Sequence, residues 1–303
     1  MTDPLDPEIR AVMDALAAAA AGGPQGLELP VEEARAASDA TGRRFGGELA
    51  PVARVEDRDL GGVGARVLWP AGHDGALVLW FHGGGWVVGS LDGFEAVCRA
   101  LAGASGAAVA MVDYRLAPEH PFPAALDDAL TATRWALAHA DELGCDPARV
   151  ALGGDSAGAN LATVAARRVP GARVQCLVYP VCDAALHTAS YRDLGEGFGL
   201  TTASMARCFE LYLAGAEPLD PDVSPLRAPD LGGLPPAFVL TCSHDPLRDE
   251  GEAYSAALSA AGVVVDLRRY DGTVHGFFRW IGATDVARRA VSEAGAWLRA
   301  GLR

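Results

Sequence analysis

Residues 152–160 read Leu-Gly-Gly-Asp-Ser-Ala-Gly-Ala-Asn, with the pattern Gly-x-Ser-x-Gly at Gly154, Ser156 and Gly158. A strand-like apolar run leads into this pattern, and a helical pattern over 157–168 leaves it. A serine between a strand and a helix occupies a sharp, strained turn that exposes its hydroxyl above the sheet. The flanking positions need glycine because a Cβ would clash with the neighbouring strand and helix. The stretch therefore predicts a serine nucleophile on a strand-turn-helix unit.

Outward from this stretch, strand-like runs alternate with helical ones. Strand signals begin near Val52, and the expected strands are 65–69, 77–81, 107–112, 149–152, 174–179, 237–242 and 263–270. The expected helices between most of the later ones are 93–104, 124–143, 157–168, 249–261 and 283–302. This alternation predicts an α/β fold, with a mostly parallel central sheet and helices on both faces.

Two segments stand outside that alternation. Residues 1–50 are rich in alanine and have helical patterns at about 7–21 and 31–41, broken by Gly22, Gly23 and Pro24. Residues 184–215 are helical around an irregular, glycine-rich loop. We expect both segments to form a helical cap, with 51–183 and 216–303 as the catalytic domain.

Composition limits the classes of partner. The chain has 303 residues, half of them hydrophobic, which suits one large α/β domain with an appendage. The net charge of −14 argues against nucleic acid and anionic membranes. All 25 basic residues are arginine, which excludes mechanisms that need a lysine.

The cysteines and the N-terminus indicate a cellular compartment. The six cysteines are scattered, form no Cys-x-x-Cys pair, and lie mostly in apolar runs, as reduced core residues do. No stretch resembles a signal peptide or a membrane span. We therefore expect a cytoplasmic protein without a membrane partner. The absence of metal-ligand and phosphate-loop motifs predicts that it needs neither a metal nor a cofactor.

A serine hydroxyl needs a base to take its proton. Of the histidines that follow Ser156, His187 lies in the expected cap and His244 ends a strand. His275 lies in the segment 271–277, which we expect to be a loop between the last strand and the last helix. We therefore predict that His275 is the base.

The base needs an acid that orients it. Asp245 directly follows an expected strand, at the sheet edge where catalytic groups emerge. A purely structural interpretation makes Asp245 the cap of the next helix and leaves Asp249 or Asp271 as the acid. We predict that Asp245 is the acid, because a carboxylate in a first helical turn is ordinarily a partner of the helix dipole.

Three consecutive glycines follow the strand at 77–81. The segment reads His82-Gly83-Gly84-Gly85-Trp86, and consecutive glycines can present backbone N–H groups to an anion. Together with the serine turn, this pattern predicts an oxyanion hole formed by the N–H groups of Gly84, Gly85 and Ala157. His82 is then a brace for the loop rather than a second base.

These motifs occur in the order found in a known family. The segments are His82–Gly85, Asp113–Glu119, Gly154–Gly158, Asp245–Glu250 and His275–Phe277. In them the chain resembles the bacterial hormone-sensitive-lipase-like carboxylesterases (family IV), which have the α/β-hydrolase fold, and the aspartate before Ser156 places it in the branch with the motif Gly-Asp-Ser-Ala-Gly. One departure is Ala159, where many relatives have a second glycine.

The resemblance implies the triad Ser156, Asp245 and His275 and the same three N–H groups. It is compatible with a homodimer, although no apolar patch in the sequence requires one.

We expect hydrolysis of short- to medium-chain acyl esters, small-molecule substrates, through an acyl-enzyme on the serine. The cap should close part of the acyl channel, and the candidate lining residues are Trp86, Phe198, Leu200, Phe209, Tyr212 and Phe277. A plainer interpretation is that these side chains form the core of the cap itself. Two other functions stay open: a catalytically silent ligand-binding protein, and an amide or carbamate hydrolase with the same triad.

Overall fold

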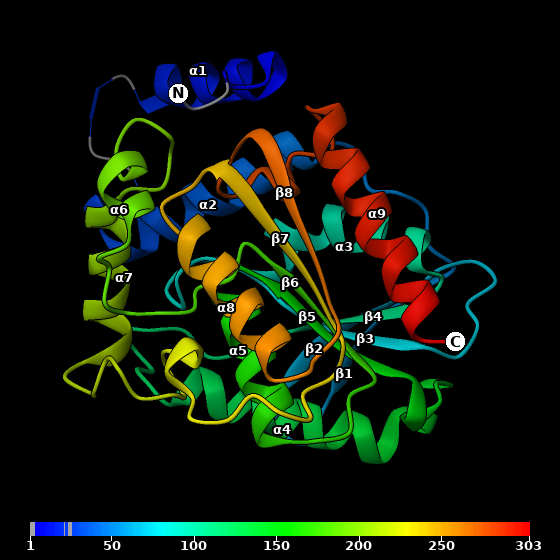
Figure 1. The fold of residues 1–303 in the computed structure, drawn as a ribbon. Helices are drawn as coiled ribbons and strands as arrows, with labels where there is room; N and C mark the ends of the chain where they lie inside the picture. The colour runs from blue at the N-terminus through cyan, green and yellow to red at the C-terminus, as the bar shows by residue number, and fades with distance from the viewer. Residues whose placement is uncertain (1–3, 21, 24–25) are drawn as a thin grey trace.

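A computed structural model describes residues 4–20, 22–23 and 26–303. In these residues one sheet has the strand order β1-β2-β4-β3-β5-β6-β7-β8 (Figure 1). From β4 to β8 neighbouring strands are parallel, whereas β2 pairs antiparallel with both β1 and β4. The strands are β1 (Arg54–Asp59), β2 (Gly64–Trp69), β3 (Leu77–Phe81), β4 (Ala108–Val112), β5 (Val150–Asp155), β6 (Val174–Val178), β7 (Ala237–His244) and β8 (Val265–Val274).

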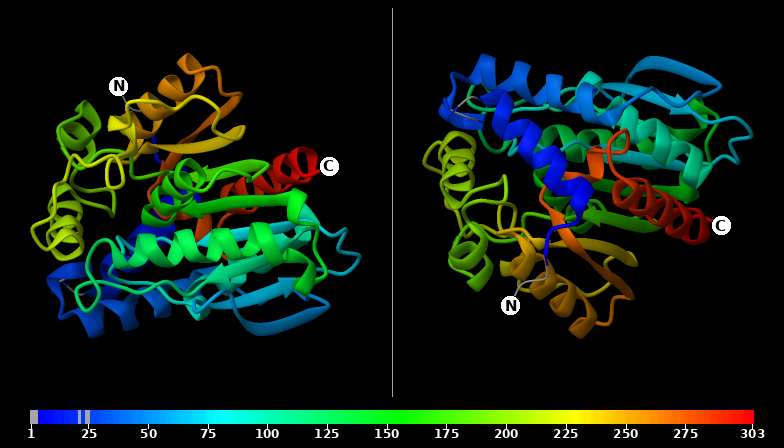
Figure 2. Two further views of the ribbon diagram at one scale, coloured as in Figure 1. Left: turned by 90° about the horizontal axis from the view of Figure 1, so that it is seen from below. Right: turned by 90° about the horizontal axis from the view of Figure 1, so that it is seen from above.

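Helices cover both faces of the sheet (Figure 2). One face packs against α4 (Ala124–His139), α5 (Ala157–Arg168) and α8 (Arg248–Ala260). The other packs against α3 (Leu91–Ser105) and α9 (Asp285–Gly301). Neighbouring residues of each central strand enter different cores because strand side chains alternate between faces. The predicted α/β architecture, a mostly parallel sheet with helices on both faces, is confirmed.

Short 3-10 segments connect several of these elements. They are η2 (Ala140–Leu143), η3 (Pro147–Arg149), η4 (Pro225–Arg227) and η5 (Phe277–Arg279).

The two segments expected to form a cap lie next to each other. The N-terminal one contains α1 (Pro7–Ala20), η1 (Gly26–Glu28) and α2 (Val31–Gly46), and the inserted one contains α6 (Ala189–Leu194) and α7 (Thr202–Leu213) (Figure 1). Helix α7 contacts η1, and α2 packs along α3. The division into a cap and a catalytic domain stays a prediction, and residues 1–3, 21 and 24–25, which belong to it, lie outside the described residues.

Tertiary packing moves three of the expected boundaries. Strand β8 continues to Val274 through the expected loop, because its pairing with β7 resumes at His244 after an irregularity. Helix α2 continues to Gly46, since Gly42 allows its backbone to approach that of α3: a Cβ there would lie 2.1 Å from the oxygen of Gly93. The helix expected over 124–143 divides into α4 and η2.

Several further properties concern only the described residues. All six cysteines are buried and in no disulfide. None of the helices described is both long and apolar enough to cross a membrane. No group of three or more His, Cys, Asp or Glu side chains in these residues could hold a metal ion.

The turn at Ser156 has the strained backbone that the sequence predicted. Its φ and ψ are 56° and −120°, in a region that side-chain-bearing residues rarely adopt. A Cβ at Gly158 would lie 1.9 Å from the oxygen of Phe81, and one at Gly154 would lie 2.5 Å from the same atom. The two glycines thus let α5 begin directly against β3.

We expect Gly158→Ala to destabilise the protein by more than about 3 kcal/mol, because the added methyl overlaps backbone atoms that cannot move independently. Urea unfolding of the variant and the wild type measures the change. Gly103→Ala is the control, since a Cβ at this position in α3 meets nothing within 4 Å. It should stabilise by up to about 1 kcal/mol, and equal losses in the two variants would contradict the steric argument.

Candidate active site

The three residues predicted to form a triad meet at the carboxyl edge of the sheet. Ser156 follows β5, Asp245 follows β7, and His275 follows β8. The Nε2 atom of His275 lies 2.9 Å from the Ser156 Oγ, and its Nδ1 atom lies 2.7 Å from the Asp245 Oδ2. Parallel strands present their carboxyl ends at one edge, which is why residues 119 positions apart come within hydrogen-bond distance.

The two hydrogen bonds of His275 suit transfer of a proton from Ser156 to the ring. A ring with its proton on Nδ1 donates to Asp245 and leaves Nε2 free to accept from the serine hydroxyl. Asp245 is fully buried, and the side chain of His275 is only 12% exposed. In such surroundings the carboxylate interacts strongly with a positively charged ring.

The structure distinguishes the candidate acids. Asp245 also accepts a hydrogen bond from the N–H of Leu247 at 2.8 Å, in the turn before α8, while it contacts His275. Asp249 instead accepts from the N–H of Ser190 and pairs with Arg248. Asp271 lies within β8 with an exposed side chain. Only Asp245 of these three is hydrogen-bonded to the ring.

Tyr179 is a neighbour of the site that the sequence analysis did not single out. Its ring centroid lies 4.5 Å from that of His275, and its backbone φ is 35°. The residue is buried and directly follows β6, at the same edge of the sheet. The only available signal was this position, which Tyr179 shares with Ser156 and Asp245.

The glycine loop after β3 and the start of α5 together offer three backbone N–H groups. Among the described residues, the N–H groups of Gly84, Gly85 and Ala157 find no protein acceptor. Gly84 has a φ of 123°, and a Cβ there would lie 2.1 Å from the oxygen of Val88. Gly83 donates to the Asp155 Oδ1 at 3.0 Å, which attaches the loop to the serine turn. The arrangement can accept a negatively charged oxygen.

His82 is buried behind this loop. Its Nδ1 lies 2.8 Å from the oxygen of Gly83, and the hydroxyl of Tyr114 donates to the backbone oxygen of His82 at 2.6 Å. Burial lowers the pKa of His82 to about 4, so the ring is neutral near pH 7. These contacts fit the expected brace.

Asp155 directly precedes Ser156 and is not hydrogen-bonded to His275. Burial raises the pKa of its carboxyl to about 6, while the charge of Arg279 and the bond from Gly83 oppose that shift. Its hydrogen bond to Gly83 makes it part of the support of the glycine loop.

The six predicted lining residues occupy three environments. Trp86 is fully buried and stacks on Tyr212 with ring centroids 4.3 Å apart, and Phe209 lies 5.3 Å from Trp86. Phe277 is fully buried against Tyr270, with centroids 5.6 Å apart. A role in substrate binding stays a prediction for these four, whose contacts are those of packed core side chains.

The remaining two lining candidates are half-buried. The ring of Phe198 lies 4.8 Å from that of His244, next to Asp245, and Leu200 lies two residues farther along the same loop. Their role in substrate binding also stays a prediction.

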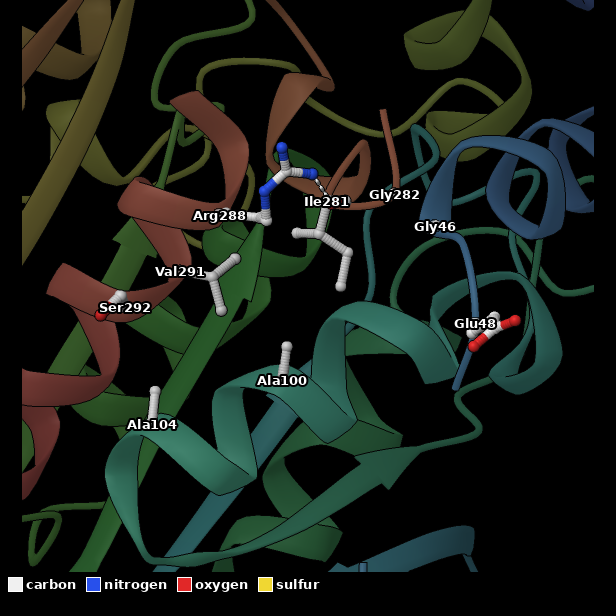
Figure 3. Close-up of a pocket in the computed structure, with 9 residues that line it drawn as sticks. All are labelled: Gly46, Glu48, Ala100, Ala104, Ile281, Gly282, Arg288, Val291 and Ser292. Carbon is white, nitrogen blue, oxygen red and sulfur yellow. Dashed lines mark hydrogen bonds between the residues drawn. The ribbon is translucent and has the colours of Figure 1, made fainter. Parts of the chain in front are cut away.

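A cavity of about 260 Å³ lies elsewhere, between α3 and α9 (Figure 3). Its wall includes Ala100, Ala104 and Val291, with Glu48 and Arg288 also beside it. None of the catalytic candidates lines it.

Comparison with known proteins gives consistent results. A family model described as the alpha/beta hydrolase fold matches residues 78–279. The chain is 40% identical to the carboxylesterase NlhH of Mycobacterium tuberculosis over 84% of this chain and 85% of that one. It is 43% identical to the carboxylic ester hydrolase LipN of the same organism, over 75% of this chain and 65% of LipN.

Solved structures agree with these matches. An α/β-hydrolase enzyme from the metagenome of Lake Arreo, Spain, superimposes with a TM-score of 0.94 at 38% identity, over 98% of both chains. A thermostable esterase from Pseudomonas putida superimposes with a TM-score of 0.91 at 34% identity, over 100% of this chain and 99% of that one.

Proposed function

Since this chain belongs to the α/β-hydrolase fold family, in its hormone-sensitive-lipase-like branch, and is a carboxylesterase, we propose that Ser156, His275 and Asp245 are its catalytic triad. The observation that carries the proposal is the continuous chain of hydrogen bonds from the serine Oγ through the ring to the buried carboxylate, 2.9 and 2.7 Å long. A catalytically silent binding protein has no need of this geometry.

The reaction proceeds in two stages. Ser156 attacks the ester carbonyl while His275 takes its proton, and the N–H groups of Gly84, Gly85 and Ala157 stabilise the oxyanion. The intermediate then collapses, and His275 protonates the departing alcohol. Water, activated by the same ring, hydrolyses the acyl-enzyme to the carboxylic acid and frees the serine.

We also propose small-molecule esters as substrates and the cytoplasm as the location. The buried cysteines without disulfides and the net charge of −14 support a reducing compartment and a protein that avoids nucleic acid and anionic membranes. A homodimer agrees with these properties but is not needed for the site, since the triad and the three N–H groups come from one chain.

We expect Ser156→Ala to lower kcat for p-nitrophenyl acetate by about 10⁴-fold or more while the protein stays folded, because the nucleophile is lost. Initial rates and circular dichroism measure the two properties. Ser255→Ala is the control, since Ser255 is a buried serine on α8 whose hydroxyl donates to the oxygen of Gly251. If Ser156→Ala kept a tenth of the wild-type kcat, the nucleophile would be another residue.

The pair Asp245→Asn and Asp249→Asn tests the acid. An amide at 245 no longer holds the ring in the required tautomer, and we expect kcat to fall by about 10³–10⁴-fold. Asp249→Asn affects the bond from Ser190 and the ion pair with Arg248, neither of which involves His275, and should lower kcat less than about tenfold. A larger loss for Asp249→Asn than for Asp245→Asn would show that the acid is misassigned.

Acyl chains of about two to eight carbons should give the highest kcat/KM. Each buried methylene contributes about 0.8 kcal/mol until the channel ends, and longer chains then clash. A p-nitrophenyl ester series from acetate to palmitate measures the optimum. Phe198→Ala removes a half-buried ring and should move the optimum to longer chains. A maximum at palmitate in the wild type would refute the short channel.

A further inference from the structure

Arg35 of α2 connects the N-terminal helices to the loop that carries two of the oxyanion donors. Its Nε donates to the oxygen of Val87 at 2.9 Å, and its Nη2 donates to the oxygen of Ala117 at 3.0 Å. Both terminal nitrogens also bond to Glu119, at 2.9 and 2.6 Å. Four hydrogen bonds from one side chain thus reach two separate segments of the catalytic domain.

The loop that Arg35 contacts needs such support. Gly84, Gly85 and Trp86 have φ values of 123°, 60° and 60°, and Trp86 is not a glycine. Residues in these regions keep their conformation only where their surroundings hold them.

Hydrogen bonds to three consecutive or nearby backbone oxygens stabilise this turn. The oxygen of Gly84 accepts from the N–H groups of Val87 and Val88. The oxygen of Trp86 accepts from the N–H of Ala117, and Arg35 bonds to the next oxygen along the chain. Hydrogen bonds therefore hold the backbone both before and after Trp86, the non-glycine residue with the positive φ.

We propose that Arg35 is a positioning residue for the reaction: by bridging the oxygens of Val87 and Ala117, it holds the N–H groups of Gly84 and Gly85 where the oxyanion forms. The N-terminal segment then contributes to transition-state stabilisation as well as covering the site. Arg35 lies outside residues 78–279, the part that the family model matches.

The chemistry of the side chain suits this task. A guanidinium has donors in a rigid plane and can serve two carbonyl oxygens and one carboxylate simultaneously, whereas an ammonium is a point charge. The hydrogen bond from Arg35 lowers the pKa of Glu119 to about 2, so this carboxylate is charged at neutral pH. Because Glu119 is half exposed, its ion pair with Arg35 adds little, and the two bonds to the oxygens of Val87 and Ala117 carry the positioning.

The test compares four variants by kcat and KM for p-nitrophenyl acetate, corrected for the folded fraction. Arg35→Met removes all the bonds, Arg35→Lys keeps the charge without the fork, and Glu119→Gln keeps both carbonyl bonds. Arg99→Met is the matched control: Arg99 also bonds to a carboxylate and a backbone oxygen, those of Glu95 and Ala50, away from the oxyanion loop.

We expect Arg35→Met to lower kcat by about 10–100-fold with KM changed less than threefold. Deleting an oxyanion donor lowers kcat by about 10²–10³-fold, and displacing one should lower kcat by less. A trifluoromethyl ketone, which forms a negatively charged hemiketal with the serine, should bind more weakly by a similar factor. Glu119→Gln and Arg99→Met should keep kcat within threefold. Arg35→Lys should lie between Arg35→Met and the wild type.

An unchanged kcat for Arg35→Met, or equal losses of kcat in Arg35→Met and Arg99→Met, would overturn the proposal. If Arg35→Met does not fold, the comparison of kcat between Arg35→Lys and Glu119→Gln decides, because only Arg35→Lys disturbs the bonds to the two carbonyl oxygens. A greater loss of kcat in Glu119→Gln than in Arg35→Lys would then refute the proposal. The inference rests on the proposed oxyanion hole, but its failure leaves the Ser156→Ala result intact, so the two are distinguishable.

Discussion

The contact of Gly158 with the backbone of Phe81 is the constraint on which the site depends. Because no side chain separates them, α5 begins directly against the end of β3, and a Cβ at Gly158 would also lie 2.6 Å from the oxygen of His82. The close approach forces the sharp turn at Ser156 and places the first N–H of α5 beside the glycine loop that starts at His82. One steric condition thus sets the conformation of the proposed nucleophile and the position of the neighbouring donors.

Each of the two segments expected to form the cap is attached to a catalytic loop. From α2, Arg35 bonds to the backbone oxygens around the oxyanion loop. From the start of α6, the hydroxyl of Ser190 donates to the oxygen of Pro246 at 2.6 Å, and its N–H donates to Asp249. Pro246 directly follows Asp245. Both segments thus bond to loops that adjoin the proposed triad and oxyanion donors.

Asp155, Asp245 and Glu250 are fully or almost fully buried carboxyl groups with different hydrogen-bond partners. Asp245 is hydrogen-bonded to the imidazole, whereas Asp155 accepts from Gly83 of the oxyanion loop. Glu250 accepts from the N–H of Cys182 at 2.7 Å, and burial raises its pKa well above the ordinary value. Of these three carboxyl groups only Asp245 is hydrogen-bonded to His275, and the other two bond to backbone N–H groups of neighbouring loops.

The sequence by itself determined the strand-turn-helix at Ser156, the parallel sheet and the glycine loop, because local sterics and side-chain periodicity govern them. Chain order also made His275 the candidate base. Only the tertiary structure decided that Asp245, rather than Asp249 or Asp271, reaches the ring, that β8 continues to Val274, and that Tyr179 and Arg35 lie against catalytic elements. Those outcomes depend on strand register and on the approach of segments remote in the chain, which no local pattern records.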